Sequence, residues 1–123
     1  TEVQGVKGAH IKKRTEITNP PPAYRLVFID EGWMTPDAFA VNYRTEAWWD
    51  DPPVRHGDGA TLSFADGHCD HWKWKGTDTI KRARLVERTH LGNWTPETDA
   101  GFKDLYRMQR GCWGRLGYTP THP

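Results

Sequence analysis

Histidines and carboxylates crowd one short window of the chain, residues 55–74, "RHGDGATLSFADGHCDHWKW". Imidazole and carboxylate groups bind transition metals, and they carry protons in general acid–base catalysis. The window also holds Trp72 and Trp74, whose rings could anchor a core or stack on a ligand. Its composition is compatible with three structures: a metal site, a catalytic centre, or a β-hairpin whose polar residues hold a turn.

The candidate metal ligands in this window are Asp66, His68 and Asp70. Side chains alternate between the two faces of a strand, so His68 and His71 point in opposite directions and do not easily share one zinc ion. Oxygen donors for calcium are available at Asp50, Asp51, Asp58 and Asp66, but the chain has no Asp-rich loop of the EF-hand kind. We therefore predict no resident cofactor, with calcium as the exception to test.

A catalytic centre would draw its acid and base from Asp30 and Glu31, at the end of a predicted strand, and from the histidines. Nothing in the sequence fixes the distances between these groups, and no nucleophile motif such as GxSxG is present. We predict that the chain is not an enzyme and assign no catalytic residue. A small metal-dependent enzyme built on His56, Asp66 and His68 is kept as the third hypothesis.

The hairpin interpretation explains more of the window. "ATLSFA" and "HCDHWKW" have strand patterns, and Asp66-Gly67 between them is a favoured two-residue turn. Such a loop places Ala65 opposite His68, with small side chains facing the indoles of the second strand. A three-residue loop would shift the register by one and exchange the faces. His56 could hydrogen-bond the turn or the neighbouring strand and fix how the chain enters the hairpin.

Other elements are predicted around this hairpin. "YRLVFID" (residues 24–30) is typical of a strand buried on both faces, "DAFAV" (37–41) of a short strand, and residues 77–89 of a helix. A C-terminal helix is expected to begin at an N-cap Thr95, followed by Pro96, and to end at Gly117. Residues 1–18 are predicted to form an arm or an edge strand.

The composition indicates one α+β domain over residues 1–123: a small antiparallel sheet with a central β-hairpin, long Trp/Pro-rich loops and a C-terminal helix. Seventeen basic residues balance sixteen acidic ones, so no overall field draws the chain to nucleic acid or an anionic membrane. No apolar run is long enough to cross a bilayer. Among the loop residues, the candidate interaction sites are Trp33, Trp48 and Trp49.

Cys69 and Cys112 are the only cysteines. In an oxidising compartment they could form one disulfide that closes a loop of about 43 residues. They could equally remain two separate thiols, because the sequence does not give the distance between them.

The ordered features of the window resemble a known family. Nine residues separate His56 from Asp66-Gly67, within "LSFADGH" and before "WKWK". With "TEITNPPPAYRLVFIDEGW", "DAFAV", "WWDDPPVRHGDG" and "MQRGCWGRLGYTP", this spacing resembles prepilin-type proteins that carry the H-x9-DG domain. The resemblance covers about residues 15–120. It marks His56, Asp66 and Gly67 as motif residues, without implying a catalytic role for them.

The resemblance implies a globular head related to type IV pilins and type II secretion pseudopilins. In that family a long N-terminal hydrophobic helix anchors the precursor and later packs into a filament core. The sequence departs from the family pattern in having no such helix, so we expect an excised head or a chain that partners a separate helical subunit. The implied role is a structural subunit on an extracellular or cell-surface filament, with itself or other pilin subunits as partners and no nucleic-acid or membrane contact. A carbohydrate- or surface-binding module with exposed tryptophans is the alternative.

Overall fold

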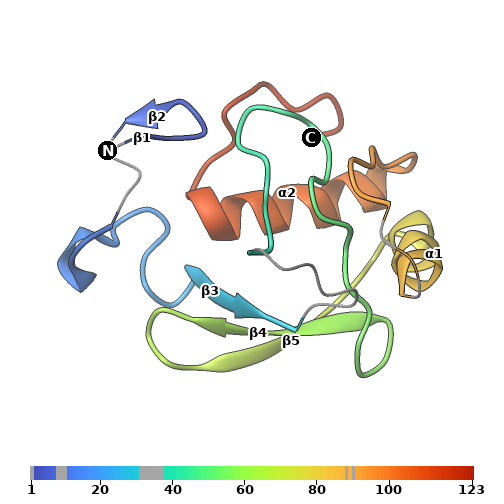
Figure 1. Cartoon of the computed structure of the whole chain (residues 1–123), viewed down its shortest axis with the longest axis horizontal. Coiled ribbons are helices and arrows are strands. Elements are labelled where there is room, and N and C mark those ends of the chain that lie inside the picture. Colours follow the sequence, from blue (N-terminus) through green and yellow to red (C-terminus); the bar gives the residue numbers. More distant parts are fainter. Residues whose placement is uncertain (1, 8–10, 31–37, 88, 90) are drawn as a thin grey trace.

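A three-stranded antiparallel sheet and a long C-terminal helix form the two main layers of the chain (Figure 1). The computed structural model describes residues 2–7, 11–30, 38–87, 89 and 91–123. The elements are β1 (Glu2–Val3), β2 (Val6–Lys7), the 3-10 helix η1 (Arg14–Glu16), β3 (Leu26–Ile29), β4 (Gly59–Phe64), β5 (Cys69–Lys73), α1 (Thr77–Val86) and α2 (Asp99–Trp113). The α+β class, with its central hairpin and C-terminal helix, is confirmed.

The β4–β5 hairpin turns through a three-residue loop, residues 65–67. The Phe64 N–H donates to the His68 carbonyl (3.0 Å), and the Gly67 N–H donates to the Phe64 carbonyl (2.9 Å). Gly67 has φ 95°, the left-handed conformation that completes a turn of this length. The pairing of Ser63 with Cys69 follows from this loop. The prediction of a two-residue loop, with Ala65 opposite His68, is therefore wrong.

Burial explains why the three-residue loop is preferred. In the observed register Ala60 pairs with Trp72, so Ala60, Leu62, Phe64 and Trp72 lie on one face of the sheet and are all buried. A slip of one residue would turn Trp72 away from Leu62 and Phe64 and expose one of the two sets. The indole of Trp72 instead lies 5.9 Å from the Phe64 ring, centroid to centroid. The apolar residues of both strands thus face the same core.

β3 is an outer strand, in the order β3-β4-β5. Leu26 pairs with Phe64 and Phe28 with Ser63, so the register shifts between them in a bulge. The expected burial on both faces is wrong, because Val27 and Phe28 are exposed. The predicted strand at residues 37–41 is not formed over residues 38–41, and residue 37 lies outside the described part.

The N-terminal residues form a small hairpin of their own. β1 and β2 pair with each other and not with the main sheet, so the expected edge strand is not found among the described residues. The Gln4 side chain ties this hairpin to a distant loop: its amide donates to the Val41 carbonyl (2.9 Å) and its oxygen accepts the Tyr43 N–H (3.1 Å). The alternative expectation, an arm, describes this segment better.

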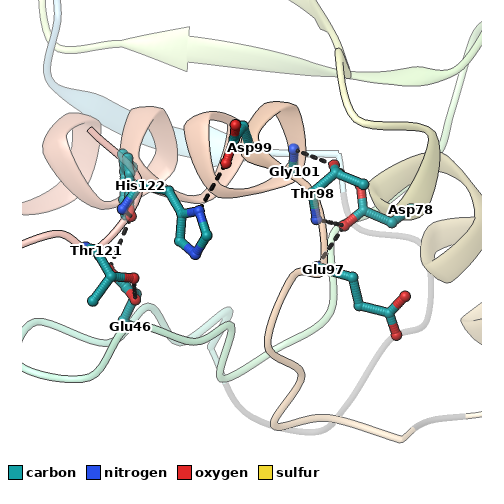
Figure 2. Close-up of polar contacts among 9 residues, drawn as sticks. Glu46, Asp78, Glu97, Thr98, Asp99, Gly101, Thr121 and His122 are labelled. Carbon is teal, nitrogen blue, oxygen red and sulfur yellow. Dashed lines mark hydrogen bonds and ion pairs between the residues drawn. The ribbon is translucent and has the colours of Figure 1, made fainter.

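Helix α2 begins later and ends earlier than predicted. Its N-cap is Thr98, whose hydroxyl accepts the Gly101 N–H (3.0 Å), and its C-cap is Gly114 with φ 82°. Figure 2 shows the cause at the first end, where Asp78 of α1 lies against Glu97 and Thr98. The Asp78 carboxylate accepts the Glu97 N–H (2.8 Å) and the Thr98 N–H (3.1 Å), which holds these residues outside the helix.

Helix α2 is covered on two sides. Phe102, Leu105 and Met108 pack with the buried face of the sheet. On another side the loop at residues 38–53 crosses the helix (Figure 1), and the Gln109 amide donates to the carbonyls of Asn42 (3.0 Å) and Thr45 (2.9 Å). The helix is therefore the central element of the fold.

The C-terminal segment is fastened to α2 by two carboxylates (Figure 2). Glu46 accepts the Tyr106 hydroxyl (2.8 Å) and the Thr121 N–H (2.8 Å). The His122 ring lies 2.7 Å from the Asp99 carboxylate, measured at Nδ1 and Oδ1. These contacts hold the segment along the helix rather than free in solvent.

A candidate binding groove beside helix α2

The motif residues lie at opposite ends of β4. His56 precedes the strand and Asp66 follows it, and a six-residue strand spans roughly 20 Å. The exposed His56 ring pairs with the neighbouring strand's end, with Nε2 3.3 Å from Asp30 Oδ2. The hypothesis of a small metal-dependent enzyme requires His56, Asp66 and His68 to lie together. The structure instead separates His56 from Asp66 and His68.

His56 opens a tight, left-handed entry into β4. Three successive residues have positive φ: His56 (56°), Gly57 (81°) and Asp58 (50°). The Arg55 N–H donates to the Gly59 carbonyl (2.6 Å), which closes the turn, and the Trp74 N–H donates to the Asp58 carbonyl (2.9 Å). His and Asp tolerate this conformation better than most side chains. At this end of β4 the motif shapes the backbone.

At the other end, Asp66 fixes the position of His68. Its carboxylate accepts the His68 N–H (3.1 Å) and contacts the His68 Nδ1. These two hydrogen bonds from His68 lower the pKa of Asp66. The His68 ring then stacks on Phe64, with centroids 4.5 Å apart and an interplanar angle of 4°. Asp66 and Gly67 thus orient a ring at the open end of the sheet.

The remaining acidic candidates also have structural partners. Asp50 accepts the Ala40 N–H (2.6 Å), and Asp51 pairs with Arg82 (2.8 Å) and accepts the Gly92 N–H (2.6 Å). Asp58 pairs with Arg84, and Asp70 accepts the His71 N–H (2.8 Å). Within the described ranges, no three His, Cys, Asp or Glu residues form a group that could hold a metal ion.

The three candidate tryptophans have different environments. Trp33 lies outside the described residues. Trp48 is 2% exposed and packs edge-on against Trp74, so its assignment as an interaction residue is wrong. Trp49 is 46% exposed. A stacking platform for carbohydrate needs a row of exposed, coplanar indoles. The two described candidates, Trp48 and Trp49, do not form one, because Trp48 is buried.

The two cysteines are free. Cys69 is exposed on β5, and it pairs with Ser63 on the face of the sheet turned away from α2. Cys112 lies on α2 among the core residues, where burial raises the pKa of its thiol to about 12. The disulfide considered from the sequence is not formed in this structure.

A groove of about 690 Å³ runs between α2 and the buried face of the hairpin. Phe64 and Trp72 line it from the sheet, together with Asp70 on β5 and His68, which directly precedes that strand. The opposite wall is α2, and residues 20–24 contribute Pro20, Ala23 and Tyr24. His68 and Asp70 occupy core-facing positions yet remain exposed, which shows that the helix covers the sheet incompletely here.

Three cations of α2 line this groove: Lys103, Arg107 and Arg110. Their spacing, i, i+4 and i+7, places them on one side of the helix. The Arg107 guanidinium lies 4.0 Å from the Trp72 ring centroid, and the Arg110 guanidinium lies 5.8 Å from that of Tyr106. The groove therefore combines aromatic surface with positive charge.

The Arg107 guanidinium is partly shielded from water. Burial lowers the pKa of its guanidinium, while the negative charges of Asp70 and Asp104 raise it. The row of cations could have been found in the sequence from its helical spacing. The opposite wall could not, because it depends on the hairpin register.

A second exposed feature lies along β3 and the turn at residues 22–24 that precedes it. Tyr24 is 67% exposed, Val27 52% and Phe28 75%. Phe28 projects from the face of the sheet opposite to α2, because it pairs with Ser63. Exposed apolar side chains gathered on an outer strand are typical of contact surfaces.

Comparisons with protein-family models, with curated proteins and with solved structures found no match for this chain. Among the described residues, no helix has the length and apolar character needed to cross a membrane.

Proposed function

We propose that this chain is a structural subunit: a pilin- or pseudopilin-like head that is exported and takes part in an extracellular filament by binding other subunits. The partners are copies of the chain itself or other pilin-like subunits. The resemblance of the His56, Asp66 and Gly67 window to the H-x9-DG proteins supplies the family, and no catalytic role is assigned to these residues.

The observation that carries the proposal is the exposed apolar stretch on β3. A monomeric protein normally protects an outer strand with charges, proline or a covering element, because unpaired strands invite association. Here Val27 and Phe28 are exposed on that strand. Their burial against a second subunit would remove apolar surface from water, at roughly 25 cal/mol per Å². This supports a role in protein association.

The placement of the motif supports the same role. His56 and Asp66 shape the two ends of β4, and each has a local structural partner, Asp30 and His68 respectively. Residues that set the entry and exit of a central strand fit a head whose task is to present a stable surface.

The test is electron microscopy of cells that produce the protein naturally, with gold-labelled antibodies against this chain. We expect label along filaments for the wild type. Phe28→Asp is expected to abolish the filament label, whereas Leu91→Asp, which alters another exposed apolar residue (50% exposed), is not. The melting temperatures of both purified variants establish that they fold. Wild-type label confined to dispersed protein, or a folded Phe28→Asp chain that labels filaments normally, would refute the proposal.

A further inference from the structure

The groove beside α2 carries a local excess of positive charge. Among the described residues, three cationic side chains, Lys103, Arg107 and Arg110, line it together with one acidic side chain, Asp70. The whole chain has a formal net charge of only +1, so this excess belongs to the groove rather than to the protein at large. A ligand that complements the groove must therefore be acidic.

The walls of the groove require apolar contacts as well. Phe64 and Trp72 lie on the sheet side, and the His68 ring extends that aromatic surface by stacking on Phe64. Tyr24, largely exposed, adds a further ring. Phe64 and Trp72 are themselves buried, beneath the stacked His68 ring and the Arg107 guanidinium, so the apolar surface open to a ligand is that of Tyr24 and the outer face of the His68 ring. A simple inorganic anion would leave this surface in contact with water. The chemistry favours a ligand that alternates acidic and apolar groups.

The spacing of the cations matches an extended peptide. From Lys103 to Arg110 the helix rises about 10.5 Å. In an extended chain, side chains on one face recur every ~6.7 Å, so three of them span about 13 Å. Long Lys and Arg side chains accommodate the difference, while the intervening side chains point to the opposite wall.

A polyphosphate fits less well. Nucleic-acid sites depend on a broad basic surface that neutralises many phosphates. The cations among the described lining residues all lie on one side of α2, and Asp70 lies on the facing strand. The negative charge of Asp70 repels other anions in the groove. Three cations can still bind two or three carboxylates beside it, but a dense polyanion would be repelled more strongly.

We infer that the groove between α2 and β5 binds an extended acidic segment of a partner protein, with its carboxylates on the cations of α2 and its apolar side chains against Tyr24 and the His68 ring. This interaction is separate from the association proposed for β3, so either can fail without the other.

The experiment uses a fluorescein-labelled peptide, Glu-Phe-Glu-Phe-Glu, and measures its binding to the whole chain by fluorescence anisotropy. The matched peptide Gln-Phe-Gln-Phe-Gln keeps the apolar groups and removes the charge. We expect the acidic peptide to bind at least about tenfold more tightly, since each exposed ion pair contributes up to about fivefold. Added salt should weaken its binding.

Charge reversal identifies the site. The double variant Lys103→Glu/Arg110→Glu should weaken binding of the acidic peptide by about tenfold or more. The control, Lys12→Glu/Lys81→Glu, makes the same change of net charge at two exposed lysines outside the groove, and it should lose less than about threefold. The single variant Lys103→Gln, at an exposed position, should fold normally and lose a smaller part of the affinity.

Three results would overturn the inference. One is equal binding of the glutamine peptide. Another is an equal loss of affinity in the control double variant. The third is tighter binding of a single-stranded oligonucleotide of thymidine, which would assign the groove to polyphosphates. Phe28→Asp should leave peptide binding unchanged, which keeps this result distinct from the proposal about β3.

Discussion

Asp104 offers a direct test of how α2 holds the rest of the chain. Its carboxylate, only 3% exposed, accepts the N–H groups of Lys75 and Gly76 at the junction between β5 and α1. The distances are 3.0 Å for Lys75, to each of the two oxygens, and 2.8 Å for Gly76. We predict that Asp104→Ala destabilises the fold more than any change at the exposed surface of α2.

The magnitude follows from the two N–H groups that lose their acceptor. A hydrogen bond to a charged group contributes about 1.5–3 kcal/mol, and a buried donor without a partner costs about 1–3 kcal/mol. Gly76 is buried, whereas Lys75 is exposed, so water can reach the second donor more easily. We expect the free energy of unfolding to fall by about 3 kcal/mol. For a chain of this size, that lowers the melting temperature by roughly 10 °C or more.

The assay is urea denaturation followed by tryptophan fluorescence. Asp104→Asn is the informative companion, because it conserves the volume of the side chain but places an amide donor against backbone donors. It should lose about 2–3 kcal/mol. Lys103→Ala, at an exposed neighbouring position, is the control and should stay within about 0.5 kcal/mol of the wild type.

A loss below about 1 kcal/mol in a normally folded Asp104→Ala protein would refute this reasoning. It would mean that the cost of removing the carboxylate from water cancels the hydrogen bonds it accepts. A large loss in Asp104→Ala with none in Asp104→Asn would show instead that side-chain volume, and not the charge, is responsible.

Two further predictions concern titratable groups. Burial raises the pKa of Glu46 and of Asp78, but hydrogen bonds outweigh it, so both lie below their ordinary values of 4.5 and 3.8. The ionised forms of both groups therefore stabilise the folded state, and this contribution is lost as the groups become protonated. The free energy of unfolding should fall as the pH drops from about 5 towards 3. Urea midpoints that stay constant over this range would contradict this prediction. Exposed Cys69 should react with a thiol reagent at pH 8 in the native state, and Cys112 only after unfolding. Equal rates would contradict the burial of Cys112, and the absence of free thiols would demonstrate a disulfide.

The strand patterns and the turn residues between them predicted the hairpin, but they did not determine its register. Asp66-Gly67 is compatible with a two-residue loop and with a three-residue loop, because a glycine with positive φ serves both. The choice was made by burial, which places Leu62, Phe64 and Trp72 on one face against α2. The fate of the tryptophans was equally dependent on packing: Trp48 is in the core and Trp49 at the surface, although they are neighbours in the chain.

The ends of α2 illustrate the same limit. The sequence around Thr95 has the features of a helix start, but Asp78 on another helix accepts the N–H groups of Glu97 and Thr98 and moves the start to Thr98. A carboxylate twenty residues away cannot be inferred from local capping preferences. The binding groove also required the tertiary structure, since one wall comes from β5 and the other from α2.

The sequence by itself determined the class of fold, the two strands of the central hairpin and the existence of both helices. These depend on side-chain periodicity and on local backbone preferences, which are properties of neighbouring residues. Only the tertiary structure decided the register of the hairpin, the exposure of β3 and the position of β5 opposite the cations of α2. These depend on which apolar surfaces are buried together, and residues far apart in the chain decide that.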